Sequence, residues 1–311
     1  MPIVLPWRWQ LVDVKSAVVH GTRIAYREAG PDDGPLILLI HGVASQSATW
    51  DLAMPFLAEQ GLHILAPDLP GHGGSEPGHG DYSLGGFATV LRDLLFTLGR
   101  GPATLVGHSM GGGIALQLAH QFPELTERLV LSASGGLGTD AHPLLRAASA
   151  PGAEFVLPLI MNRRVTWAMH RARRVLEGWG RTPGLLSDGA MRNYGALSTP
   201  QGRRVFLATV RSVINHTGQR VTAVGRLHLT SHLPTLLISC SDDPAIPRAH
   251  AEAAHAELPG SRLEILPGRS HRPHQLDPER FARVLGDFVR STAPATDPPT
   301  WRSRGVARLD G

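Results

Sequence analysis

The chain has 311 residues, enough to bury a large hydrophobic core in one or two domains. Its hydrophobic content of 42% and charged content of 18% are ordinary for a folded globular protein. Thirty basic residues oppose twenty-six acidic ones, so the net charge is only +4, and the arginines that carry nearly all of the positive charge are spread along the sequence. This pattern argues against a nucleic-acid partner.

The cysteine content and the length of apolar runs bear on the cellular compartment. Cys240 is the only cysteine, so no intrachain disulfide can form. The first ten residues lack a basic start followed by a long apolar stretch, so we expect no secretory signal. No run approaches eighteen apolar residues, so we expect no membrane-spanning helix and a cytoplasmic location.

The first 132 residues alternate between predicted strands and predicted helices. Val12–Val19 and Thr22–Glu28 flank a glycine turn and predict an antiparallel hairpin. Apolar runs and amphipathic segments then alternate and predict a largely parallel sheet with helices on both faces. The strands are predicted at Leu36–Ile40, Leu62–Ala66, Ala103–Gly107 and Arg128–Ser132, and the helices at Ser47–Gln60, Ser83–Leu98 and Gly112–Phe122.

The alternation stops after this point and resumes late in the chain. Residues 135–229 contain helix-like segments, many arginines and few strand signals. We therefore expect one α/β core, formed by residues 1–134 and 230–291, with a helical insertion at 135–229. Residues 292–311 hold three prolines and no apolar periodicity, which predicts a disordered tail. Strands are predicted again at Leu236–Ser239 and Arg262–Leu266, and helices at Arg248–Glu257 and Pro278–Arg290.

A glycine-flanked serine follows the predicted strand at Ala103–Gly107. The sequence there is Gly107-His108-Ser109-Met110-Gly111, and a predicted helix comes next. A sharp strand-to-helix turn crowds the positions two before and two after the serine, and glycine suits both because it has no Cβ. Ser109 is therefore a candidate nucleophile, which needs a histidine to take its proton and a carboxylate to hold that histidine.

Two adjacent aspartates are candidates for the carboxylate. Asp242 and Asp243 follow the predicted strand at Leu236–Ser239. Neighbouring side chains point in different directions, so only one of the two can face the site.

The candidate base lies between the last predicted strand and the last predicted helix. A loop at that position can carry the imidazole of His271 toward Ser109. His250 and His274 compete for the role, but the place of His271 in the chain favours it. Serine, acid and histidine then occur in the chain order of the α/β-hydrolases.

Two backbone N–H groups are candidates for holding a developing oxyanion. The N–H of Met110 follows the nucleophile directly. The second is expected from His41-Gly42-Val43, with Val43 as the donor. Gly42 would let the backbone approach a substrate, and we interpret His41 as a histidine that braces this loop.

The loop from Asp68 to Ser75 is rich in glycine and histidine. It contains no G-x-x-x-x-G-K-[ST] sequence, and its glycines do not fit G-x-G-x-x-G. His72 and His79 are seven residues apart, which is poor spacing for a metal site. We predict a structural turn here, and no cofactor or metal for the protein.

Taken together, these residues resemble the α/β-hydrolase superfamily, specifically its capped branch of small esterase-like and C–C-bond-cleaving enzymes. The resemblance implies a mostly parallel eight-stranded sheet with a helical cap inserted after the sixth strand, which residues 135–229 would form. It also implies an acid four residues before a proline, which selects Asp243 because Pro247 follows it at that spacing. The matching stretches span about residues 15–291 and are Leu39-Ile40-His41-Gly42 with Trp50, Asp68-Leu69-Pro70-Gly71-His72-Gly73 with Ser75, Gly107-His108-Ser109-Met110-Gly111-Gly112, Asp243-Pro244-Ala245-Ile246-Pro247, and Gly268 to His271 with Asp277-Pro278-Glu279-Arg280-Phe281.

Departures from the family pattern narrow the chemistry. Arg272 follows the histidine where C–C-bond hydrolases often have Trp, and His108 precedes the serine where they often have Asn. A serine nucleophile in place of aspartate argues against haloalkane dehalogenase and epoxide hydrolase chemistry. Cys240 and Leu276 also stand where relatives often carry Gly and an acidic residue.

We therefore predict a serine hydrolase that cleaves a small-molecule carboxylic ester through an acyl-enzyme intermediate. C–C-bond hydrolysis or a related acyl transfer by the same triad stays open, as does a non-catalytic ligand receptor on the same fold. The arginines of the insertion either form a solvated face or meet a substrate carboxylate, and the oligomeric state stays open. Candidate substrate contacts are His41, Gly42, His108, Phe155 and Trp167.

Overall fold

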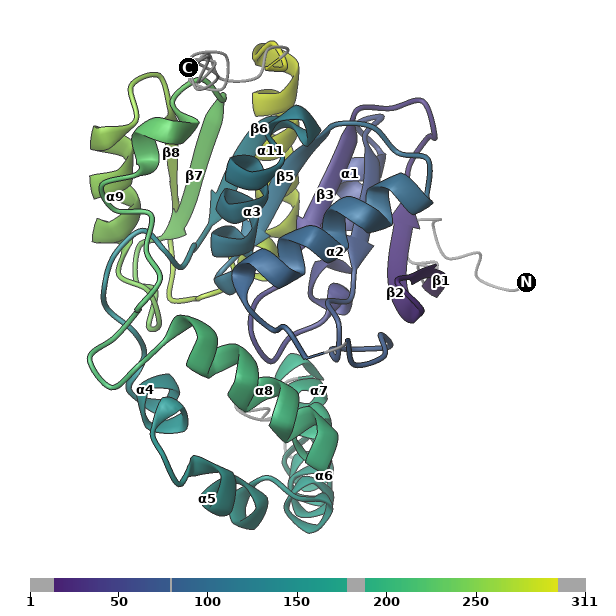
Figure 1. The fold of residues 1–311 in the computed structure, drawn as a ribbon, viewed down its shortest axis with the longest axis vertical. Coiled ribbons are helices and arrows are strands. Elements are labelled where there is room, and N and C mark those ends of the chain that lie inside the picture. The colour runs from purple at the N-terminus through teal and green to yellow at the C-terminus, as the bar shows by residue number, and fades with distance from the viewer. Residues whose placement is uncertain (1–13, 79, 178–187, 296–311) are drawn as a thin grey trace, which may run out of the picture.

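The computed structural model describes residues 14–78, 80–177 and 188–295 (Figure 1). Its centre is a mostly parallel eight-stranded sheet in the order β1-β2-β4-β3-β5-β6-β7-β8, as predicted. Only β2 runs antiparallel to its neighbours β1 and β4. The strands are β1 Val14–Val19, β2 Thr22–Ala29, β3 Leu36–Ile40, β4 His63–Pro67, β5 Ala103–His108, β6 Thr126–Ser132, β7 Thr235–Cys240 and β8 Arg262–Leu266.

Helices cover both faces of this sheet because the inner strands are apolar on both sides. In β3, Leu38 and Ile40 pack into one hydrophobic cluster, while Ile37 and Leu39 pack into the other. The first cluster includes side chains of α2 (Leu84–Thr97), α3 (Met110–Gln121) and α9 (Arg248–Glu257). The second includes side chains of η2 (Ser47–Trp50), α1 (Met54–Ala58) and α11 (Pro278–Ser291).

The prediction of one helix over Ser47–Gln60 is wrong. The structure has the 3₁₀ turn η2 and the short helix α1 in its place. Pro55 explains the break, because its ring would clash with the carbonyl of Asp51 four residues earlier if one helix continued through both.

The chain between β6 and β7 is largely helical, and all of its helices but the last lie beyond one end of the sheet (Figure 1). We call it the insertion. It has its own apolar cluster, which includes Leu157, Phe206 and Val210. Its helices are α4 Pro143–Ser149, α5 Ala153–Ile160, α6 Arg163–Glu177, α7 Asp188–Leu197, α8 Pro200–Val213 and η5 Leu227–Thr230, of which η5 packs against the core helices α3 and α9.

The last described residues lie against the sheet. Arg128 donates hydrogen bonds to the hydroxyl and to the carbonyl oxygen of Thr292, at 2.9 and 2.7 Å. The N–H of Ala295 donates to the carbonyl of Glu127. The prediction of disorder from residue 292 is therefore wrong for 292–295, and its remainder, 296–311, lies outside the described residues. Within the described ranges, no helix is long and apolar enough to cross a membrane.

Candidate active site

Ser109 occupies a strained turn between β5 and α3. Its backbone has φ 56° and ψ −122°, in the positive-φ range that L-residues rarely adopt. The turn is held by hydrogen bonds from the N–H of Ser109 to the carbonyl of Ser132, and from the N–H groups of Gly112 and Gly135 to the carbonyl of Ser109. Because β5 is flanked by β3 and β6, the turn presents the hydroxyl at the carboxyl end of a central strand.

The glycines of the turn have no room for a side chain. A Cβ on Gly107 would lie 2.2 Å from the carbonyl oxygen of Gly111. A Cβ on Gly111 would lie 2.2 Å from the carbonyl oxygen of Ile40, at the end of β3. These contacts are with backbone atoms, which cannot rotate away. The steric reason for the glycine pattern is therefore present in the structure.

The imidazole of His271 lies between Ser109 and Asp243. Its Nε2 is 3.0 Å from the Ser109 hydroxyl, and its Nδ1 is 2.9 and 3.1 Å from the two carboxylate oxygens of Asp243. The side chain of Asp243 is completely buried. Asp242 is exposed and accepts a hydrogen bond from the hydroxyl of Ser241. Of the two adjacent aspartates, only Asp243 faces the histidine.

The hydrogen bonds of Asp243 determine the tautomer of His271. The Oδ1 atom accepts from the backbone N–H groups of Ala245 and Ile246, at 2.8 and 3.1 Å. A carboxylate with these contacts acts as an acceptor, so Nδ1 of His271 must be the protonated nitrogen. The lone pair of Nε2 then faces the Ser109 hydroxyl, which is the arrangement required for a general base.

Val43 and Met110 both border the cavity that contains Ser109. Met110 is the first residue of α3, so its N–H belongs to the helical turn that has no intrahelical acceptor. Val43 precedes Ala44, whose φ of 51° turns the backbone sharply after β3. Both residues therefore border the same cavity as Ser109, and their role as donors to an oxyanion stays a prediction.

Two buried histidines support the loop that carries His271. The Nε2 of His108 donates to the carbonyl oxygen of His271 at 2.7 Å, and its ring is 4.7 Å from that of His274. The Nε2 of His274 is 2.9 Å from the hydroxyl of Thr49. Burial lowers the pKa of His108 and of His274 well below the ordinary value. Both rings are therefore neutral at pH 7 and add no charge beside His271.

His41 lies behind the cavity. Its Nε2 accepts from the N–H of Leu69 at 3.0 Å, and its Nδ1 donates to the carbonyl of Gly42 at 2.8 Å. It thereby connects the loop after β3 to the loop after β4. In that second loop, the carboxylate of Asp68 accepts from the N–H groups of Ser47 and Gly74. These contacts give the polar side chains of both loops a structural role.

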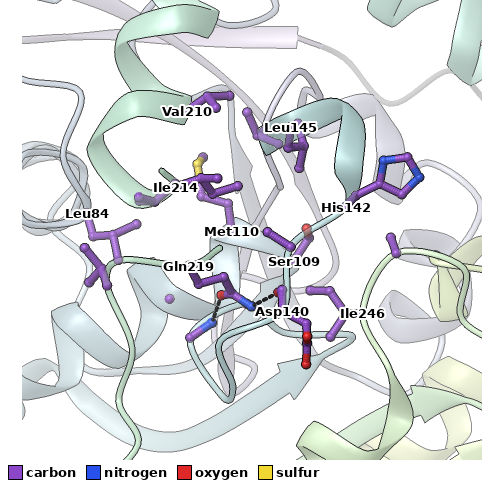
Figure 2. Close-up of a pocket in the computed structure, with 18 of the residues that line it drawn as sticks. Leu84, Ser109, Met110, Asp140, His142, Leu145, Val210, Ile214, Gln219 and Ile246 are labelled. Carbon is purple, nitrogen blue, oxygen red and sulfur yellow. Dashed lines mark hydrogen bonds between the residues drawn. The ribbon is translucent and has the colours of Figure 1, made fainter. Parts of the chain in front are cut away.

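The cavity over Ser109 is mainly apolar and lies between the core and the insertion. Val210 lines the cavity from α8, Ile214 from the residue that caps the end of α8, and Leu145 from α4. Figure 2 shows these three side chains gathered on one side of Ser109. Gln219 supports the cavity wall, because its amide accepts from the N–H of Gly136 and donates to the carbonyl of Asp140.

The structure corrects two of the predicted substrate contacts. Phe155 is 77% exposed and Trp167 is 60% exposed, and neither borders the cavity. Their aromatic character was the only signal in the sequence. His41 and His108 are buried one layer behind the cavity, and a Cβ on Gly42 would lie 3.0 Å from the Cβ of Ser109.

The residues that line the cavity from the insertion were not predicted from the sequence. They include Leu145, Val210 and Ile214, together with the polar residues Asp140 and Gln219. The apolar spacing within α8 indicates which face of this helix is buried, but the sequence alone does not indicate that the buried face lies next to Ser109.

Other reactive groups lie outside this arrangement. Burial, with the charge of Asp243, raises the pKa of the Cys240 thiol to about 11, so this cysteine is not an activated nucleophile. Among the described residues, Glu28, Asp32 and His63 form a group that could ligate a metal. The guanidinium of Arg100 is 2.9 Å from both carboxylates, so a cation already occupies that position.

Comparisons with known proteins agree with the fold. A sequence profile of the alpha/beta hydrolase family matches residues 37–284. The chain is 40% identical over 282 residues to an uncharacterized protein of Mycobacterium tuberculosis, covering 89% of this chain and 81% of that protein. It is 29% identical over 266 residues to a pyrethroid hydrolase of Sphingobium wenxiniae, covering 83% and 88% of the two chains.

A solved structure gives the same result for the fold. The meta-cleavage product hydrolase from Pseudomonas fluorescens superposes with a TM-score of 0.66 at 23% identity, covering 90% of this chain and 98% of that one. The chain belongs to the alpha/beta hydrolase family and is a hydrolase. The predictions of this fold and of an enzyme are thereby confirmed.

Proposed function

We propose that the protein is a serine hydrolase that cleaves a carboxylic ester through an acyl-enzyme intermediate. The observation that carries the proposal is the single line of contacts from Ser109 through His271 to Asp243, with distances of 3.0 and 2.9 Å. Similarity to a pyrethroid hydrolase supports hydrolysis as the reaction. The mainly apolar cavity over Ser109 supports a substrate with an apolar acyl or alcohol group.

In the first step, the hydroxyl of Ser109 attacks the acyl carbon while Nε2 of His271 takes its proton. Asp243 stabilises the imidazolium that forms. The N–H groups of Val43 and Met110 hold the negative charge that develops on the carbonyl oxygen. His271 then gives the proton to the departing alcohol, which leaves the acyl group on Ser109.

In the second step, a water molecule replaces the alcohol. His271 takes a proton from the water, which attacks the acyl-enzyme, and the same histidine returns the proton to the Ser109 oxygen as the acid departs. The residues described need no additional group for this proton transfer. We propose that the insertion acts as a cap, because Val210 and Ile214 border the cavity from above the nucleophile. A cytoplasmic location stays a prediction.

The test compares the native protein with Ser109→Ala on p-nitrophenyl esters. Among the described residues, the Ser109 hydroxyl hydrogen-bonds only to His271, so the variant should fold normally and lose ester turnover. Circular dichroism checks the fold. Ser83→Ala is a control for loss of a serine hydroxyl elsewhere, because Ser83 caps α2. Unchanged turnover by Ser109→Ala would refute the assignment. A panel of thioester and dienone substrates separates ester hydrolysis from acyl transfer and C–C-bond hydrolysis.

A further inference from the structure

The outer helices of the insertion expose several large apolar side chains. On α5, Phe155 is 77% exposed and Leu159 is 73% exposed, and Val156 and Ile160 are more than half exposed. These four positions are spaced i, i+1, i+4 and i+5, so they form one face of the helix. Only Leu157 of α5 is buried. A contiguous exposed apolar face of this kind marks an interaction surface.

The next helix adds positive charge and a tryptophan. On α6, Arg163, Trp167, Arg171 and Arg174 are spaced by four, four and three residues, so they share a face, and all four are exposed. The guanidinium carbon of Arg171 lies 5.8 Å from the centre of the Trp167 ring. Among the described residues, no ion pair neutralises the arginines of this face.

The corner between the two helices brings the end of the apolar face close to the first arginine of α6. The side chain of Asn162 accepts from the N–H groups of Arg164 and Val165, and donates to the carbonyls of Pro158 and Leu159. Only two residues separate Ile160 from Arg163, so the Cα atoms of these two residues are at most about 11 Å apart. Both helices lie at the end of the molecule farthest from the sheet (Figure 1).

The acidic groups of these helices do not cancel the charge. Glu154 of α5 pairs with Arg211, and Glu177 of α6 pairs with Arg173. Exposed aliphatic and aromatic side chains next to the arginines of α6, with a tryptophan among them, match the chemistry of an anionic lipid surface. We propose that this α5–α6 face docks on anionic phospholipid membranes, with the apolar side chains entering the headgroup boundary and the arginines meeting lipid phosphates.

The experiment measures co-sedimentation of the full chain with vesicles of phosphatidylglycerol or of phosphatidylcholine. Binding should occur with phosphatidylglycerol, weaken strongly between about 50 mM and about 500 mM salt, and be absent with phosphatidylcholine. Phe155→Ser with Leu159→Ser should weaken binding about tenfold or more. Arg163→Gln with Arg171→Gln should weaken it about 25-fold, since each arginine near an anionic surface contributes about fivefold.

Matched variants elsewhere on the surface serve as controls. Phe96 and Leu52 are exposed apolar residues of the core, at 64% and 49%, and Phe96→Ser with Leu52→Ser should leave binding within twofold of native. Arg248→Gln with Arg283→Gln removes the same net charge from other helices and should also leave it within twofold. Circular dichroism and the melting temperature show whether each variant is folded.

Three results would overturn the proposal. The first is no binding to phosphatidylglycerol vesicles by the native protein. The second is that the control variants weaken vesicle binding as much as the α5–α6 variants do. Binding would then depend on net charge or on overall hydrophobicity rather than on this face. The third is a dimer in analytical ultracentrifugation that Phe155→Ser with Leu159→Ser dissociates, without vesicle binding, which would assign the α5–α6 face to a second copy of the chain. None of these measurements depends on ester turnover.

Discussion

Replacement of Asp243 by asparagine should reverse the tautomer of His271 without changing the shape of the site. The Oδ1 atom of Asp243 accepts two backbone N–H groups, from Ala245 and Ile246. In Asp243→Asn, these donors require the amide oxygen at that position, which places the amide NH₂ beside Nδ1 of His271. Nδ1 must then be the acceptor, so the ring proton moves to Nε2, which faces Ser109. A protonated Nε2 cannot take the serine proton.

The expected loss in kcat is about 10⁴-fold, as for the same substitution in other serine-histidine-aspartate sites, or about 5 kcal/mol of transition-state stabilisation. Steady-state turnover of p-nitrophenyl acetate at pH 7.5 measures it. Asp242→Asn is the matched control, because Asp242 is exposed and accepts from Ser241; it should stay within about twofold of native. Retention of a tenth of native kcat by Asp243→Asn, or equal loss of activity in both variants, would refute this reasoning.

Three further predictions concern stability and specificity. Gly111→Ala should lower the free energy of unfolding by at least about 1–3 kcal/mol, because the new Cβ would lie 2.2 Å from the carbonyl oxygen of Ile40. Gly101→Ala is the control: its Cβ would enter open space, so no steric clash should lower the melting temperature. Burial, with the nearby His41, lowers the pKa of His72 to about 3, so the unfolded chain binds more protons than the folded chain between pH 6.5 and 3. The stability present above pH 6.5 is therefore lost as pH falls, by about 3 kcal/mol at pH 4.5. Urea titrations of His72→Gln should show a weaker loss toward acid. Leu84→Ala should raise kcat/KM for long acyl chains relative to acetate by about tenfold, because Leu84 borders both the cavity over Ser109 and a neighbouring cavity; an unchanged ratio would contradict this.

The strands were the most predictable part of the fold. Leu36–Ile40 and Arg262–Leu266 coincide with β3 and β8, because a short apolar or alternating run between turn residues is typical of a strand and too short for most helices. The strained turn at Ser109 was also predictable, since its glycines are required by close backbone contacts. These features depend on residues that are near one another in the chain.

Features that depend on distant packing were not predictable. The exposure of Phe155 and Trp167 follows from how α5 and α6 sit against the rest of the insertion, which no local pattern specifies. The cavity walls from α8 depend on the same packing. Disorder was predicted for 292–295 from the prolines and the lack of apolar periodicity. The hydrogen bonds that Arg128 makes with Thr292 depend on contacts between distant parts of the chain, which that pattern does not reveal.

The most direct test asks which side chain of the native protein reacts as the nucleophile. The folded protein is treated with a fluorophosphonate probe, digested and analysed by mass spectrometry. Because Nε2 of His271 lies 3.0 Å from the Ser109 hydroxyl and is held by a buried carboxylate, a single adduct is expected on the peptide that contains Ser109, and labelling should fall steeply in Asp243→Asn. No adduct on the folded protein, or an adduct on a different serine with Ser109 unmodified, would contradict the claim that this hydroxyl is the nucleophile.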